Sequence, residues 1–164
     1  MAFNIKTFSD NVVNILTNAN TTTATIDISD GLTDKRVQSI KLGYHVNKSH
    51  LNILYPAIWI EPQSRSDQFA QIGNNAKRDM IVPFNIVAIV QTGLGSINGR
   101  ENSDSEMLQL SSNIETFIRN NIRLSSTSDV LQTLITNVNY DVTEDNDTYN
   151  SISIISCESK VLSI

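Results

Sequence analysis

Apolar residues at helical spacing mark the first predicted element, over residues 3–17. They recur three and four positions apart and draw one stripe along a helix: Ile5, Phe8, Val12, Ile15 and Leu16. We expect this helix to lie on a sheet, because a one-sided apolar stripe needs another apolar surface to cover it.

A polar segment, residues 17–52, follows this helix and is rich in Asn and Thr. Within residues 17–30, alternation is seen only at Ile26 and Ile28, so we expect a mobile loop that ends in a short strand. Residues 32–42 fit either a strand or a short amphipathic turn. The pattern assigns no role to the segment as a whole.

Two apolar runs, residues 53–61 and 79–92, predict the central strands. In the second run, alternate residues share one face: Met80, Val82, Phe84, Ile86, Ala88 and Val90. Neither run leaves a polar face near its middle, so both of its sides must be covered. The polar residues 62–78 between the runs predict a long hairpin loop. Pro83 cannot donate to a ladder, and it therefore indicates an edge position or a bulge.

The strongest helix pattern covers residues 103–124, where apolar residues recur at helical spacing: Met107, Leu110, Ile114, Phe117, Ile118 and Ile122. Ser103 with Glu106 three residues later matches a capping box, which predicts that the helix begins there. Two strands joined by a turn at residues 144–147 close the chain. In the first of them, residues 134–142, one set of side chains should face the same way: Leu134, Val138, Tyr140 and Val142.

This order of elements is typical of the α+β class, since strands joined by turns pair antiparallel. We predict a single domain over residues 1–164, with a mainly antiparallel sheet and two helices packed on one face. A bare edge strand carrying the run IVAIV would be an aggregation hazard. We therefore also expect a subunit that forms a closed ring through identical head-to-tail contacts.

Charge and cysteine content narrow the function classes. With 17 acidic and 12 basic residues the formal net charge is −5, and general nucleic-acid binding needs a basic footprint. The single Cys157 lies among isoleucines, where a buried inert thiol is expected, and no Cys/His spacing fits zinc. The chain has no signal-peptide pattern and no apolar run long enough for a membrane. We expect a soluble intracellular protein without metal, cofactor or membrane partner.

Three local patterns suggest a catalytic or binding site, but each lacks part of the motif that such a site requires. The glycines of residues 93–99 lie between a strand and a helix, but their spacing is not that of a phosphate-binding loop. The acidic residues 141–147 lack the glycine and final glutamate of a calcium loop, which favours a solvated turn. His45 and His50 accompany no nucleophile motif and fit surface positions. We therefore expect no enzyme.

Several elements together carry a resemblance to a known family. They are the helix at the start, the segment Tyr55-Pro56-Ala57-Ile58, the long hairpin, the helix containing LQLSSNIETFIRNN, and the closing pair of strands. In these features the chain resembles the tail terminator (tail-completion) proteins of tailed bacteriophages, over most of its length from Leu54 onward. The resemblance implies a structural virion subunit of a ring, commonly a hexamer. Such a ring caps the head-proximal end of the tail tube, ends tube polymerisation and joins tail to neck.

The resemblance also implies partners. They are further copies of the chain, the tail tube protein, and a neck or head-completion protein. Genomic DNA would pass through the lumen without sequence-specific binding. An acidic subunit suits such a lumen, because a negative wall does not hold DNA by counterion release.

Two sets of residues are candidates for these contacts. The candidate interface strand presents the second apolar face of the central strands, through Trp59, Ile81, Pro83, Val87 and Ile89. The long hairpin loop is a candidate arm for contact with the tube or with a neighbouring subunit, through Arg65, Phe69, Lys77 and Arg78. The same loop also fits a disordered hairpin tip.

Two other functions remain open on the sequence. One is another connector of the neck, such as a head-completion or stopper protein, which would bind on the portal side. The other is a small cytoplasmic α+β enzyme or ligand-binding subunit. Its pocket would lie near the loop of residues 93–99, beside a perturbed acid or base.

Overall fold

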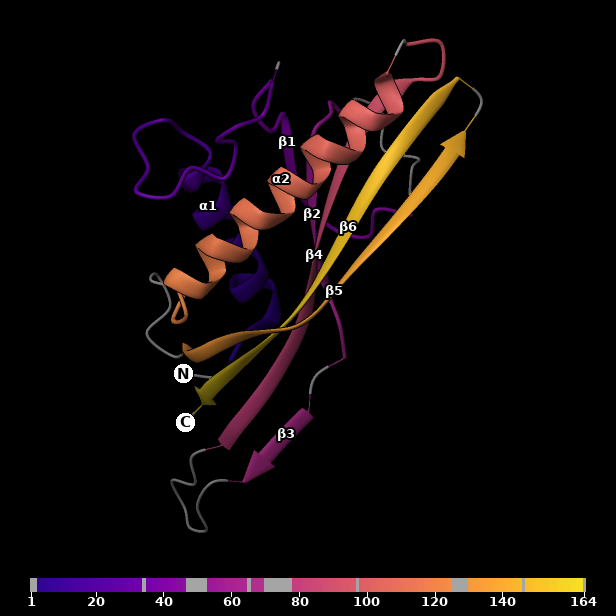
Figure 1. Cartoon of the computed structure of the whole chain (residues 1–164). Coiled ribbons are helices and arrows are strands. Elements are labelled where there is room, and N and C mark those ends of the chain that lie inside the picture. The colour runs from indigo at the N-terminus through magenta and orange to yellow at the C-terminus, as the bar shows by residue number, and fades with distance from the viewer. Residues whose placement is uncertain are drawn as a thin grey trace.

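The computed structural model describes residues 3–33, 35–46, 53–64, 66–69, 78–96, 98–124, 130–145 and 147–163. Within these ranges the chain forms two helices and a six-stranded sheet (Figure 1). In chain order the elements are α1 (Ile5–Ala19), β1 (Ser39–Leu42), β2 (Ala57–Pro62), β3 (Ser66–Phe69), β4 (Arg78–Gly93), α2 (Gly99–Asn120), β5 (Val130–Asp145) and β6 (Thr148–Ser163).

The strands of the sheet lie in the order β1-β2-β4-β6-β5, and β3 pairs with one end of β4. β1 and β2 run parallel, whereas every other pair is antiparallel. Both helices pack on one face of this sheet, and α2 crosses it diagonally in Figure 1. The predicted α+β domain, with a mainly antiparallel sheet and two helices on one face, is confirmed.

The main core lies between the helices and the sheet. Phe8 and Leu16 of α1, Leu110 and Ile114 of α2, and Phe84 of β4 are all at most 2% exposed. The rings of Phe8 and Phe84 meet edge to face, with their centroids 5.5 Å apart, which is a favourable aromatic geometry. The predicted helical stripe and the predicted inner face of β4 therefore meet in one cluster.

The polar segment after α1 is held by side-chain hydrogen bonds, and it contains no strand at Ile28, contrary to the prediction. Residues 20–33 form turns. The Asn20 amide donates to the Val37 carbonyl at 2.8 Å, and the backbone N–H of Val37 donates to the Ser29 hydroxyl at 3.0 Å. Ile28 is fully buried in the core. Polar side chains replace a ladder here, as Asn and Ser commonly do in turns.

α2 begins at Gly99, four residues before the predicted capping box. Ser103 is instead a buried helical residue whose hydroxyl donates to the Val90 carbonyl at 3.1 Å. Glu106 accepts from the backbone N–H of Thr33 at 3.0 Å and so ties the polar segment to the helix. The Ser-x-x-Glu pattern serves tertiary contacts here, which a local motif cannot reveal.

Gly99 packs closely against the preceding turn. A Cβ at this position would lie 2.6 Å from the Cβ of Ser96 and 2.9 Å from the hydroxyl oxygen of Thr92. A Cβ at Gly95 would meet no atom within 4 Å. A side chain is therefore excluded at the first residue of α2 and tolerated in the loop before it.

Hydroxyl groups join α2 to β6. The hydroxyl oxygens of Ser111 and Ser153 lie 2.8 Å apart, and both residues are fully buried. The Ser151 hydroxyl donates to that of Ser103 at 3.1 Å. On the same face, burial and the nearby Glu115 carboxylate raise the pKa of Cys157 to about 12. The predicted burial of this thiol is confirmed, and its inertness stays a prediction.

A register shift at residues 135–137 divides β5. It separates side chains that were predicted to share a face: Leu134, Val138, Tyr140 and Val142. Val138 pairs with Ile155 and packs against the main core, whereas Leu134 pairs with the exposed Glu158 on the opposite face. The extra residue of a bulge reverses the alternation. The predicted single face therefore holds for Val138, Tyr140 and Val142 but is wrong for Leu134.

Pro83 lies in a central strand, and the pairing of β4 with β6 has no register shift there, so β4 is neither the predicted edge strand nor bulged at this residue. β4 pairs with β6 along its whole length, and β2 and β3 share its other side. The Gln63 N–H donates to the Pro83 carbonyl at 3.0 Å, which places the proline nitrogen toward the gap where β2 has ended and β3 has not begun. The missing N–H of proline is tolerated there because neither β2 nor β3 pairs with β4 at this residue, so no strand needs a hydrogen bond from it.

Candidate subunit interfaces

β5 forms one edge of the sheet. It runs for 16 residues beside β6, and within the described residues no strand pairs with its outer side (Figure 1). An edge of this length presents a row of free backbone donors and acceptors, which proteins normally cover or interrupt. The charged residues of β5 are all acidic: Asp141, Glu144 and Asp145.

Large apolar side chains are exposed along this edge. Four of them are between 43% and 53% exposed: Leu131, Leu134, Tyr140 and Val142. Tyr140 and Val142 pair with Ser153 and Ser151, which bond to α2, so they lie on the helix-covered face. Leu134 lies on the other, open face. The edge is thus apolar on both faces.

The opposite edge, formed by β1 and the residues beside it, carries a second group. Its exposed apolar side chains are Leu42, Tyr44, Val46 and Leu54. Three hydrogen bonds hold these residues to the sheet. The backbone N–H groups of Gly43 and Leu54 donate to the Ile60 carbonyl and the Ser39 hydroxyl, and the side-chain hydroxyl of Tyr44 donates to the Pro62 carbonyl. The segments that carry these apolar side chains are therefore held in place by hydrogen bonds to the sheet.

The two edges hold most of the exposed apolar surface. Ten large apolar residues are exposed in the described part of the chain, and eight of them belong to these two groups. The other two, Leu108 and Ile122, lie on α2 and just after it. Sequence reasoning missed the β1 group, because the edge positions follow only from the strand order.

The residues of the candidate interface strand lie inside the chain. Trp59, Val87 and Ile89 are at most 5% exposed, in a second apolar cluster on the open face of the sheet. Ile53 and Tyr55, just before β2, pack against this cluster. Ile81 and Pro83 are half-buried. The chain itself therefore covers the second apolar face of residues 57–60, and these five residues offer a neighbour little surface.

The residues of the candidate arm are only partly placed. Arg65 and Lys77 lie outside the described residues. Phe69 and Arg78 pair in the register of β3 and β4, so the backbone forms a hairpin at this end of the sheet. The predicted contact of this arm with the tube or a neighbour stays a prediction.

His45 is held by a buried carboxylate, contrary to the predicted surface position. Its backbone N–H and its Nδ1 both contact Oε1 of Glu61, at 2.8 and 2.5 Å. Glu61 is only 6% exposed. A buried carboxylate needs such partners, and the pair fastens the chain after β1 to the end of β2. His50 lies outside the described residues.

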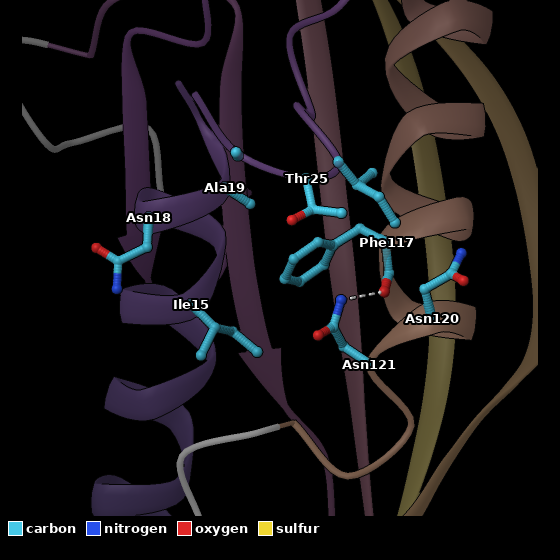
Figure 2. A pocket seen from close by; sticks show the side chains of 9 residues that line it. Ile15, Asn18, Ala19, Thr25, Phe117, Asn120 and Asn121 are labelled. Atoms are coloured by element: carbon cyan, nitrogen blue, oxygen red, sulfur yellow. Dashed lines mark hydrogen bonds between the residues drawn. The ribbon is translucent and has the colours of Figure 1, made fainter. Parts of the chain in front are cut away.

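A cavity of about 480 Å³ lies between the last turns of α1 and α2. Its walls are apolar, amide and hydroxyl side chains: Ile15, Asn18, Ala19, Ala24, Thr25, Ile26, Phe117, Asn120 and Asn121. Figure 2 shows the Phe117 ring directed between Ile15 and Thr25, and the Asn121 amide donating to the Phe117 carbonyl at 2.9 Å. Among the described residues of this lining, none has a side chain suited to general acid–base catalysis.

A smaller polar cavity of about 260 Å³ adjoins the loop of residues 93–99, where an enzyme pocket was expected. Lys35, Glu106 and Tyr55 contribute to its lining, and burial raises the pKa of Tyr55 above 10. A tyrosine whose pKa is raised in this way is less ionised near pH 7. Among the described lining residues, no hydroxyl group is hydrogen-bonded to a side-chain base. The cavity has room for a small polar molecule.

Comparisons with known proteins identify no family for the chain: no family model and no curated protein matches it. Within the described residues, no group of three or more His, Cys, Asp or Glu side chains is placed to hold a metal ion. Neither α1 nor α2 is long and apolar enough to cross a membrane.

Proposed function

We propose that the chain is a structural virion subunit that assembles into a ring at the head-proximal end of a phage tail tube, where it ends tube polymerisation and joins the tail to the neck. One observation carries this proposal. The exposed apolar side chains gather at the two opposite edges of one sheet.

The distribution of these side chains favours a ring over a simple dimer. A two-fold dimer uses the same patch on both copies, so it would cover one edge of each sheet and leave the other bare. A ring of head-to-tail contacts covers both edges of every copy. It also removes the edge strands that would otherwise template aggregation.

The remaining support comes from the sequence. The segment Tyr55-Pro56-Ala57-Ile58 and the order of elements resemble tail terminator proteins, and the net charge of −5 suits a lumen that lets DNA pass. On this proposal the partners are further copies of the chain, the tail tube protein and a neck or head-completion protein. DNA is not bound by sequence.

Light scattering of the purified chain, alone and with tail tube protein, tests the proposal. We expect either a ring-sized species, or a monomer that becomes a ring only on tubes. Serum albumin at the same mass concentration controls for crowding. A chain that stays monomeric and ignores tubes would overturn the proposal. A ring that ignores tubes but binds portal-side neck proteins would replace it with the neck-connector function.

A further inference from the structure

We propose that the β5 edge of one copy pairs with the β1 edge of the next copy, with Asp141 opposite Lys41. This inference rests on the proposed function, because it names the contact that would close the ring. The occupant of each edge is a second copy of this chain.

Lys41 and Asp141, one on each edge, have opposite charges and lie on the same face of the sheet. Asp141 is paired with Ile152 and Lys41 with Trp59, and both of these partners belong to the apolar cluster on the open face. Asp141 and Lys41 therefore lie on the same face at opposite ends of the sheet. Both are exposed, and neither forms an ion pair within the described residues. Opposite charges facing each other across strands are stabilising.

The apolar residues match in the same register. Ile40 and Leu42 flank Lys41, and Tyr140 and Val142 flank Asp141. Because side chains alternate along a strand, placing Lys41 opposite Asp141 brings each apolar pair together on the helix-covered face. This holds whether the two strands run parallel or antiparallel. In this one register, the opposite charges meet on the open face and the apolar side chains meet on the helix-covered face.

Pairing of β5 with a second β5 is disfavoured by charge. β5 has three acidic residues and no basic one, so this contact would bring the Asp141 carboxylates of both copies to one edge and add no strand cation there. Glu144 is already paired with Arg100 of α2 at 2.8 Å. Pairing with β1 brings Lys41 to this edge instead. Because the contact uses two different surfaces, repetition gives a ring when the rotation closes.

Two charge reversals test the pairing: Lys41→Glu and Asp141→Lys. Each alone puts like charges opposite each other at every contact, so the concentration for half-assembly should rise about two- to fivefold. In an equimolar mixture, copies of the two variants that alternate around an even-numbered ring have opposite charges at every contact. One chain carrying both changes has opposite charges at every contact in a ring of any number. Both preparations should assemble at the wild-type concentration.

The outcomes separate this inference from the proposed function. Stronger assembly by Asp141→Lys, with no effect of Lys41→Glu, would mean that β5 pairs with itself, because the added lysine would relieve the repulsion between acidic edges. The inference would then be wrong. A wild-type ring that neither reversal weakens would place the contact elsewhere and overturn the inference while the ring stands. A wild-type chain that never assembles, even with tubes, would overturn the proposed function as well.

Cysteine cross-linking tests the register without relying on charge. Lys41→Cys mixed with Asp141→Cys should give a disulfide-linked dimer, because facing Cβ atoms lie about 4.5–5.5 Å apart. Asn139→Cys is the matched control, since it lies on the same face two residues away. Equal cross-linking by both β5 variants, or none by either, would refute the register. The buried Cys157 does not compete.

A pair of lysine substitutions tests the apolar half of the contact. Val142→Lys should abolish assembly at concentrations where the wild type is fully assembled. Leu108→Lys should leave assembly unchanged, because Leu108 is similarly exposed, 49% against 51%, but lies on α2. Equal effects of the two substitutions would contradict the assigned edge.

Discussion

The Ser111–Ser153 pair allows the link between α2 and β6 to be measured. Both residues are fully buried, and their hydroxyl oxygens are 2.8 Å apart. Replacing one with Ala leaves the other hydroxyl in the interior without this partner, which costs about 1–3 kcal/mol. Replacing both removes two polar groups together and can be nearly neutral. The two single substitutions should therefore cost more together than the double substitution.

The two single substitutions should also differ. A serine within a helix can turn its hydroxyl to the carbonyl four residues earlier, which for Ser111 is that of Met107. Ser153 lies on a strand and lacks this alternative. We expect Ser111→Ala, which leaves the Ser153 hydroxyl without this partner, to lower the free energy of unfolding by about 2 kcal/mol. Ser153→Ala should lower it by about 1 kcal/mol. The double variant should lose about 1 kcal/mol, which gives a coupling energy of about 2 kcal/mol.

Urea unfolding followed by tryptophan fluorescence measures these energies, because Trp59 is the single tryptophan and is buried. The midpoint should shift without a change in slope. The exposed Lys6–Asp10 pair is the control, with an expected coupling below about 0.5 kcal/mol. If the losses from the single serine variants add up to that of the double variant within about 0.5 kcal/mol, the hydroxyls do not interact as described.

Three further predictions follow from the local chemistry. Because burial raises the pKa of Cys157 to about 12, its thiol should resist alkylation at pH 8 until urea unfolds the chain, and rapid labelling of the folded protein would contradict this. Burial alone would raise the pKa of Asp27, but hydrogen bonding to Arg36 holds it below 3.8. The stabilisation is therefore present above pH 3.8 and lost as the pH falls through the folded pKa, so Asp27→Asn should flatten the acid limb of a stability–pH curve. Gly99→Ala should lower the melting temperature despite the better helix propensity of alanine, whereas Gly95→Ala, which meets open space, should not.

Local periodicity was enough to predict α1, the body of α2 and the inner face of β4. It could not predict the strand order, because pairing joins residues far apart in sequence. Pro83 illustrates this, since its tolerance depends on where β2 ends and β3 begins. The start of α2 was also missed, because Ser103 bonds to a neighbouring strand instead of capping the helix.

The candidate interfaces were harder to predict than the fold. Trp59 was predicted to lie at an interface because it is a large apolar residue. In the structure, residues just before β2 pack against the apolar cluster that contains Trp59. Leu42 and Tyr44 lie in a segment to which the sequence assigned no role, and their position at an edge emerges only from the order β1-β2-β4-β6-β5. Exposure depends on which strands end the sheet, and no local pattern encodes that.

The central position of β4 has a consequence for how the chain folds during synthesis. Its partner along its whole length is β6, and α2 and β5 lie between the two in sequence. Both faces of β4 are apolar at its centre, yet its ladder with β6 cannot begin until the ribosome has released Thr148 and cannot be complete before Ser163. Long-range pairing of this kind folds slowly, and unpaired strands are prone to association. A nascent chain of this protein therefore carries one edge of β4 unpaired while α2, β5 and β6 are still being translated, a period in which chaperone binding would protect it.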